Sequence, residues 1–315
     1  MSADTGARAT VTTAAPTSPV RTVRPRVIGL SWPAVAALAL VGLVGAVAFA
    51  WPFLASADFV RAHGNDAPWL FAVLLGLLTL VCLAEVSSGR LDAKTIAVLG
   101  VAAAAGGAMR LLSAGTAGLE PMFFVVVVAG RVLGPGVGLV SGALAVTTGA
   151  LLTGGVGPWL PFQMLCAGAI GLGAGLLPVR PAARAERWVL AAYALLTGLL
   201  YGAVMNLWFW PFLGAGTAPG LAFVPGAPLT QNLSHYGLFY LATSLGWDLP
   251  RGVLNAVLVV VAGPALLRVF RRAARRAAFG APVTFESRAD AVDRDVPDVP
   301  DVPDVPDVHD AGPRP

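Results

Sequence analysis

The sequence predicts an all-α polytopic membrane protein, and three observations support that fold class. Hydrophobic residues make up 57% of the 315 residues, and charged residues only 12%. The apolar residues form stretches long enough to cross a bilayer, which takes about 20 residues at 1.5 Å per residue. The basic residues gather in alternate gaps between these stretches. Little of the chain is left to form a soluble domain.

We expect eight membrane-spanning helices. In chain order they cover residues 32–54, 68–86, 93–112, 121–133, 137–153, 159–179, 187–212 and 252–270. The fourth and fifth are separated only by the glycine-rich break at 130–136, so they could instead form one broken or re-entrant unit. Within the long connection 213–250, residues 233–245 are expected to form an amphipathic or half-buried helix.

The basic residues predict how these helices are oriented. Fifteen of them lie in one set of gaps, including the segments before the first span and after the last, whereas the opposite gaps hold only Arg61, Arg110 and Arg251. Lys and Arg are retained on the cytoplasmic side of a membrane. Eight spans in the cell membrane with both termini in the cytoplasm satisfy this rule, whereas seven would place a terminal arginine cluster outside.

Both ends of the chain predict disordered cytoplasmic tails. Residues 1–31 are rich in Thr, Ala, Pro and Arg, and residues 279–315 contain a repeated Asp-Val-Pro motif. Proline at every third position together with like charges favours an extended, solvated chain.

Several functional classes are not supported by the sequence. The net charge of +4 comes mostly from arginines beside apolar stretches, without the interleaved aromatic residues that bind nucleic acid. There is no phosphate-binding Gly-x-x-x-x-Gly-Lys-Ser/Thr loop, and His235 is the only histidine expected near the membrane. We therefore expect no metal, no cofactor and no nucleic-acid partner.

Three outer gaps carry the candidate binding residues. Arg110 and Glu120 flank the first of them, where they could pair with each other, hold a ligand or simply lie at the membrane interface. Trp159 and Gln163 follow a loop of glycines and prolines, and their alternatives are ligand contact or a helix–helix hydrogen bond in a tight hairpin.

The third gap and its flanks hold the remaining candidates, Asn206, Trp210, His235 and Tyr236. Aromatic residues here could form only an interfacial belt, but such a belt requires no amide. The convergence of aromatic, amide and charged residues in the three gaps predicts a small-molecule pocket that opens outward.

The third expected span presents a stripe of small residues at Ala97, Gly100, Ala104 and Ala108. Small residues let membrane helices approach closely. The stripe could pack within the bundle or dock to a separate membrane partner.

The chain from residue 91 to about 276 resembles the substrate-binding S component of energy-coupling factor (ECF) vitamin transporters, in particular an actinobacterial branch. The resemblance is carried by the small-residue stripe and by three segments, GTAGLEPMFF at 115–124, GRVLGPG at 130–136 and LTGGVGPWLPFQM at 152–164. It implies a six-helix substrate-binding domain over residues 91–278. The two spans within residues 32–90 would be additional transmembrane helices.

The resemblance also implies a function. Such a subunit captures a vitamin or vitamin-like molecule from outside, here for instance cobalamin. It delivers the molecule inward with a transmembrane coupling subunit and two ATPase subunits, and in the family the small-residue stripe contacts the coupling subunit. No covalent chemistry is expected. Two alternatives are an intramembrane enzyme that acts on a lipid or peptide through Glu120, His235 and Asp248, and a purely structural membrane protein.

Overall fold

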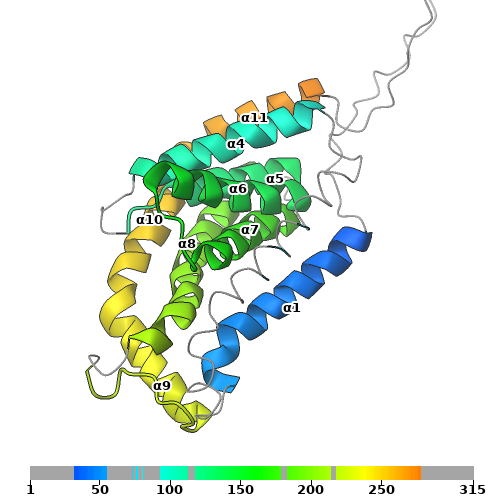
Figure 1. The fold of residues 1–315 in the computed structure, drawn as a ribbon. Coiled ribbons are helices and arrows are strands. Elements are labelled where there is room, and N and C mark those ends of the chain that lie inside the picture. The colour runs from blue at the N-terminus through cyan, green and yellow to red at the C-terminus, as the bar shows by residue number, and fades with distance from the viewer. Residues whose placement is uncertain are drawn as a thin grey trace, which may run out of the picture. The chain divides into compact units, whose positions relative to one another are not determined.

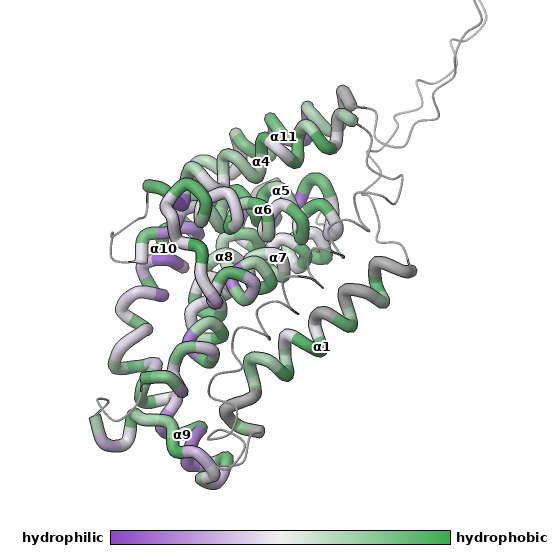
Figure 2. Tube along the Cα trace, in the orientation of Figure 1, coloured by the Kyte–Doolittle hydropathy of each residue, from purple (hydrophilic) through white to green (hydrophobic). Residues whose placement is uncertain are grey.

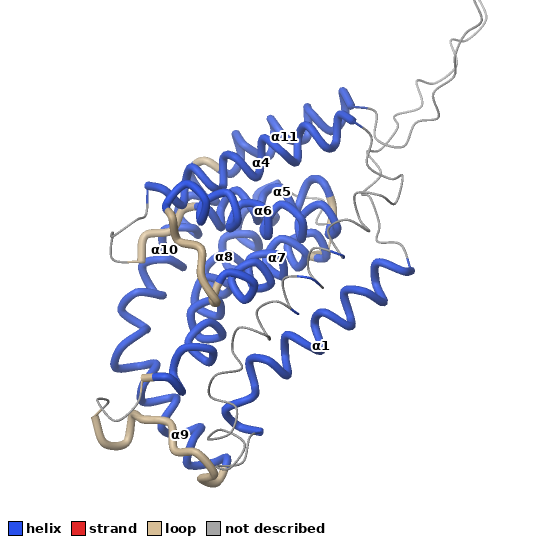
Figure 3. The backbone as a smooth tube through the Cα atoms, in the orientation of Figure 1, coloured by secondary structure: helices blue, strands red, loops and turns tan. Residues whose placement is uncertain are grey.

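The computed structural model describes residues 32–54, 73, 76, 80, 93–112, 118–178, 183–213 and 218–277. Within these ranges every regular element is helical (Figures 1 and 3). The expected tails at 1–31 and 279–315 and nearly all of the expected span 68–86 lie outside the described residues.

The helices follow the order in which the apolar stretches occur. The main helices are α1 (Trp32–Leu54), α4 (Ala93–Leu112), α5 (Met122–Leu133), α6 (Pro135–Thr153), α7 (Leu160–Leu176), α8 (Ala183–Phe209), α9 (Leu229–Phe239), α10 (Leu245–Val261) and α11 (Gly263–Ala277). A short 3₁₀ helix, η1 (Trp210–Phe212), follows α8, and a π-helical segment, η3 (Tyr240–Ser244), joins α9 to α10.

Four helical stretches are long and apolar enough to cross a membrane. They are Thr95–Leu112, Pro135–Thr153, Ala185–Phe212 and Leu229–Val261, and Met122–Leu133 and Leu160–Leu176 are shorter apolar helices. Large apolar side chains such as Val101, Leu196 and Val261 are more than half exposed, as expected of surfaces that face lipid. Figure 2 shows that hydrophobic residues dominate the helices, with hydrophilic residues on α9 and α10. The chain is an all-α polytopic membrane protein.

Helix α5 forms the centre of the bundle. Residues 122–130 are all buried, which explains why this short helix is apolar on every side. Helices α4, α6, α7 and α11 pack around it. Close packing of α6 against α7 requires glycine, because a Cβ at Gly138 or Gly171 would collide with the backbone of the other helix.

The last expected span differs from the structure. The sequence predicts one helix over 252–270, but helical backbone runs from Leu229 to Val261, and after a turn at Ala262 the separate helix α11 begins. Helix α11 is amphipathic. It buries Leu267, Phe270 and Ala274 against the bundle and exposes Arg268.

An ion-pair cluster joins α5, α8 and α11. The carboxylate of Glu186, which is only 6% exposed, accepts hydrogen bonds at 2.7 Å from Arg131 Nε and from Arg271 Nη2. Arg131 Nη1 also donates to the Leu177 carbonyl oxygen at 2.7 Å. The two arginines neutralise a carboxylate that would be costly to bury alone.

Helix α1 packs its C-terminal half against the rest of the chain. Ala48 and Phe49 are buried together with Phe162 of α7, and the two phenylalanine rings meet edge to face at 5.0 Å. Phe53 lies beside Trp210 and Tyr236. Helix α1 therefore contacts α7, η1 and α9.

Candidate ligand-binding cavity

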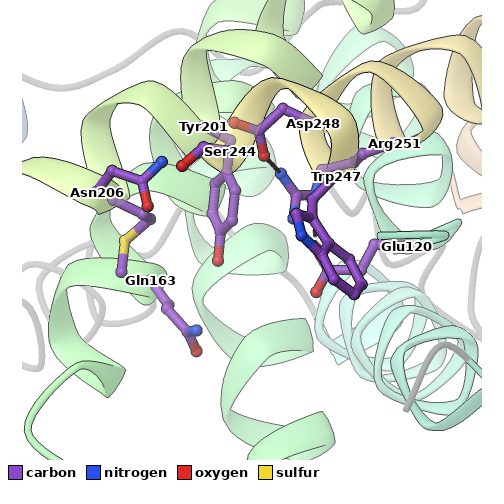
Figure 4. A pocket seen from close by; sticks show the side chains of 10 residues that line it. Glu120, Gln163, Tyr201, Asn206, Ser244, Trp247, Asp248 and Arg251 are labelled. Atoms are coloured by element: carbon purple, nitrogen blue, oxygen red, sulfur yellow. Dashed lines mark hydrogen bonds and ion pairs between the residues drawn. The ribbon is translucent and has the colours of Figure 1, made fainter. Parts of the chain in front are cut away.

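A cavity of about 250 Å³ lies between the start of α5, the start of α7, the C-terminal half of α8 and the η3–α10 junction. Its lining mixes carboxylates, a guanidinium, amides, hydroxyls and aromatic rings, as Figure 4 shows. The lining residues are Glu120, Gln163, Tyr201, Gly202, Met205, Asn206, Ser244, Trp247, Asp248 and Arg251.

Arg251 organises the charges of this cavity. Its Nε donates to Glu120 Oε2 at 2.7 Å, and its Nη1 donates to Asp248 Oδ1. The three side chains are only 12%, 18% and 4% exposed. The guanidinium carbon also lies 5.3 Å from the centre of the Tyr201 ring, which is a favourable cation–π distance. One cation is therefore shared between two carboxylates and an aromatic face.

Asn255 fixes the position of Glu120 from behind. Its Oδ1 accepts the backbone N–H of Phe124 at 2.7 Å, and its Nδ2 donates to the Glu120 carbonyl oxygen at 2.7 Å. The first N–H groups of a helix have no partner within it, and Pro121 at the start of α5 supplies no side-chain cap. The fully buried Asn255 amide supplies this cap from α10, so one side chain closes the helix end and holds the Glu120 backbone.

Gly202 lets Asp248 lie against the backbone of α8. A Cβ at Gly202 would collide with the Asp248 carboxylate. One turn earlier, Gly198 is similarly close to the backbone of Gly252. Helices α8 and α10 approach closely along this line of glycines, and the approach brings Tyr201 next to Arg251.

Arg110 and Gln163 form a second polar pair at the edge of the cavity. Arg110 Nη2 donates to Gln163 Oε1 at 2.7 Å, which links α4 to α7. The Arg110 side chain reaches Gln163 by passing over Gly149 of α6, where a Cβ would collide with its methylene groups. Gln163 itself lines the cavity, so Arg110 acts on the cavity through the amide.

The structure brings some of the predicted binding residues together. Glu120, Gln163 and Asn206 line the same cavity, and Arg110 contacts it through Gln163. Their ligand contacts remain predictions.

The other four predicted binding residues are not among the lining side chains. Trp159 is 38% exposed and donates its Nε1 hydrogen to the Gly155 carbonyl oxygen at 3.2 Å. Trp210, His235 and Tyr236 belong to an aromatic cluster that packs the loop 218–228 onto α8 and α9. Their roles in ligand binding also remain predictions.

Trp210 is the centre of this aromatic cluster. It is 1% exposed, and its Nε1 donates to the Leu221 carbonyl oxygen at 2.7 Å. The rings of Phe223 and Tyr236 lie 5.4 and 5.2 Å from it. His235 Nδ1 lies 2.8 Å from the Ala222 carbonyl oxygen. Of the three residues considered for an intramembrane enzyme, Glu120 and Asp248 both pair with Arg251. The third, His235, lies in the aromatic cluster and not beside these two carboxylates.

Several lining residues do not stand out in the sequence. On α8, Tyr201, Gly202 and Met205 share one helical face with Asn206. Across the η3–α10 junction, Ser244, Trp247, Asp248 and Arg251 recur at intervals of three or four residues. Four residues back from Asn206 the helical repeat leads to Gly202, which lies next to Tyr201.

The small-residue stripe of α4 faces away from the bundle. Ala97, Gly100, Ala104 and Ala108 are all exposed, and nothing lies within 4 Å of a Cβ built on Gly100. The other side of α4 packs on α5 and α6. The stripe is therefore open to another molecule, and its docking role remains a prediction.

Comparison with known proteins gives the family. The model of the ECF transporter substrate-specific component matches residues 94–263, which is more than half of the chain and contains every lining residue of the cavity. No curated protein and no solved structure matches the chain. Within the described ranges, no group of three His, Cys, Asp or Glu side chains is placed to hold a metal ion. The extent of the match establishes that the chain belongs to the family of ECF transporter substrate-specific components.

Proposed function

We propose that this chain is the membrane-embedded substrate-binding subunit of an ECF-type importer of the cell membrane. It captures a vitamin or vitamin-like small molecule from outside. It then delivers the molecule inward together with a transmembrane coupling subunit and two ATPase subunits, and it carries out no covalent chemistry itself.

The observation that carries the proposal is the position of the polar cavity. It contains Glu120, at the start of α5, whereas Arg131 near the other end of α5 joins the cluster of Glu186 and Arg271. Arginine-rich ends of membrane helices stay in the cytoplasm. This rule supports a cavity that faces the exterior and termini that both lie in the cytoplasm.

The exposed stripe on α4 supports the second half of the proposal. Small side chains over about three turns leave a flat surface on which another membrane helix can pack closely. We propose that Ala97, Gly100, Ala104 and Ala108 dock onto the coupling subunit. The four residues of this surface are exposed, and α4 packs on α5 and α6 through its other side.

The size of the cavity favours a compact ligand. About 250 Å³ is below the roughly 300–1,000 Å³ of typical small-molecule pockets. Cobalamin, with its corrin ring and nucleotide loop, is far larger than this space. A vitamin or vitamin precursor with one or two rings fits it better.

Two measurements test the proposal. The purified full chain, without nucleotide, should bind one member of a panel of vitamins and vitamin precursors. Cells that express the chain with the coupling subunit and both ATPases should take up that same molecule, and omitting the chain should abolish uptake. If a folded chain, verified by its thermal unfolding, bound no member of the panel and supported no uptake, the proposal would be wrong.

A further inference from the structure

We infer that the ligand carries a cationic N–H group, such as a protonated amine or amidinium, which Asp248 receives, and a hydrogen-bond acceptor at its other end, which Gln163 receives. This inference rests on the proposed function, because it assigns the chemistry of the molecule that the cavity holds.

The charges of the lining give the first argument. Among the lining residues, Glu120 and Asp248 carry negative charge, and Arg251 carries the one positive charge. Arg251 is already paired with both carboxylates. An anionic ligand would meet two carboxylates and a guanidinium that is already engaged, so the lining repels it. A cationic ligand would complete the neutralisation of the carboxylates.

Hydrogen bonds that are missing from the buried lining give the second argument. Asp248 Oδ2 and the Tyr201 hydroxyl are buried, and neither has a hydrogen-bond partner among the described residues. Asp248 is 3% exposed and Tyr201 is 6% exposed. The hydroxyl of Tyr240 lies close to the Asp248 carboxylate and donates to the Leu199 carbonyl oxygen at 3.4 Å, a distance at the upper limit for a hydrogen bond.

A buried carboxylate oxygen without a donor is unfavourable, and the penalty is removed when a donor arrives. In Figure 4 one oxygen of Asp248 is joined to Arg251 and the other points away from it. A ligand N–H⁺ directed at Asp248 Oδ2 would form a charge-assisted hydrogen bond, which is about twice as strong as a neutral one. The Tyr201 hydroxyl points away from Asp248 in Figure 4, so it is placed to contact the middle of the ligand.

The other end of the cavity has the opposite preference. The Gln163 amide oxygen is occupied by Arg110 Nη2, at 2.7 Å. What Gln163 offers a ligand is therefore its amide N–H₂ group, which donates and does not accept. In Figure 4 Gln163 and Asp248 stand at separate ends of the group of lining residues, with Tyr201 between them. The ligand is therefore bipolar, with a donor toward Asp248 and an acceptor toward Gln163.

Three matched probes test this inference on the full chain in a neutral maltoside detergent. They are 3-(aminomethyl)benzamide, 3-(hydroxymethyl)benzamide and 3-carbamoylbenzoate. All three contain a benzene ring with a carboxamide as the acceptor. Their second substituent is a cation in the first, a neutral hydroxyl in the second and an anion in the third. Saturation-transfer NMR at pH 7, with empty micelles as the blank, gives their relative affinities. The cationic probe should bind about tenfold or more tightly than the neutral one, and the anionic probe should bind most weakly.

Variants tie that preference to the cavity. Asp248→Asn keeps the size of the side chain and removes its charge, so the advantage of the cationic probe over the neutral one should fall about tenfold. The exposed Arg268→Gln change on α11 should leave the advantage intact. If Asp248→Asn does not fold, Glu120→Gln is used in its place, and it should reduce the same advantage.

Equal or tighter binding of the neutral or anionic probe would overturn the inference, and so would a failure of the cationic probe to bind. An unchanged preference in a folded Asp248→Asn variant would also overturn it. Binding and uptake of the vitamin panel test the proposed importer function independently of the charge preference of the probes. A neutral or anionic vitamin that bound and was transported would contradict the cationic assignment and leave the importer function in place.

Discussion

Arg251 Nε of α10 donates to Glu120 Oε2, just before α5, at 2.7 Å, across 131 positions of the sequence. Both residues line the cavity, and Arg251 also pairs with Asp248 on its own helix. The bond therefore ties the last long helix to the central one at the site where we place the ligand.

Replacing Arg251 with methionine should strongly destabilise the protein. The change keeps an unbranched side chain but leaves the Glu120 and Asp248 carboxylates facing each other without their shared cation. Removing one partner of a buried ion pair costs about 3–5 kcal/mol. Chemical denaturation in detergent, followed by helical circular dichroism, measures the loss in the free energy of unfolding.

Arg268→Met is the matched control, since Arg268 is exposed on α11. We expect it to change the free energy of unfolding by about 0.5 kcal/mol or less, as most surface substitutions do. Equal losses for the two variants would show that the position of Arg251 in the charge cluster is unimportant.

Gly202→Ala should separate α8 from α10 and weaken ligand binding. The new methyl group would collide with the Asp248 carboxylate, and overpacking of this kind costs about 1–3 kcal/mol. Gly246→Ala is the comparison, because nothing lies within 4 Å of a Cβ at that position. It should be neutral or stabilising by up to about 1 kcal/mol, since alanine favours helix over glycine. Thermal unfolding and ligand affinity are measured on both variants. If Gly202→Ala left both quantities unchanged, the close contact between Gly202 and Asp248 would be contradicted.

The effects of Glu186→Gln and Arg131→Gln should be strongly non-additive. The two side chains are joined at 2.7 Å and both are more than nine-tenths buried, so a double-mutant cycle should give a coupling energy of about 1–3 kcal/mol. Glu186→Gln combined with Arg251→Met should instead be additive to within about 0.5 kcal/mol, because those groups lie in separate clusters. Additivity in the first pair would mean that the ion pair contributes nothing.

Enlarging the stripe on α4 should separate ligand binding from assembly. Gly100→Leu with Ala104→Leu fills an exposed surface that contacts no part of the cavity lining, so ligand affinity should be unchanged. Co-purification with the coupling subunit should fall by about tenfold or more, since close helix packing needs small residues. Leu196→Phe, at an exposed position on α8, should leave assembly unaffected. Normal co-purification of the α4 variant would rule out this docking surface.

The helices were predictable where apolar stretches end at glycine, proline or charge. The expected span 93–112 coincides with α4, and the break at 130–136 becomes the turn at Gly134 between α5 and α6. The last span was wrong because Asp248, Pro250 and Arg251 resemble the polar end of a helix. In the structure Asp248 and Arg251 lie inside one continuous helical stretch, where Arg251 pairs with Asp248 and with Glu120 from the segment before α5. That partner is remote in sequence, so no local pattern indicates it.

The cavity was predictable only in part for a similar reason. Glu120, Gln163 and Asn206 are polar residues next to apolar stretches, and this made them candidates. Tyr201 and Trp247 could equally face lipid, and only the packing of α8 against α10 decides that they face the cavity. Trp210 attracted attention as an aromatic residue near the outer surface, but its ring is buried in the cluster that holds the loop 218–228.

The most direct test of the central claim is saturable binding of the transported molecule to the purified chain without ATP, compared between two tryptophan variants of α8. Asn206→Trp places a large ring in the cavity, whereas Leu196→Trp places the same ring on an exposed face of the same helix. We predict one binding site per chain in the wild type and in Leu196→Trp, and none in a folded Asn206→Trp. Undiminished binding by Asn206→Trp would show that the ligand lies elsewhere.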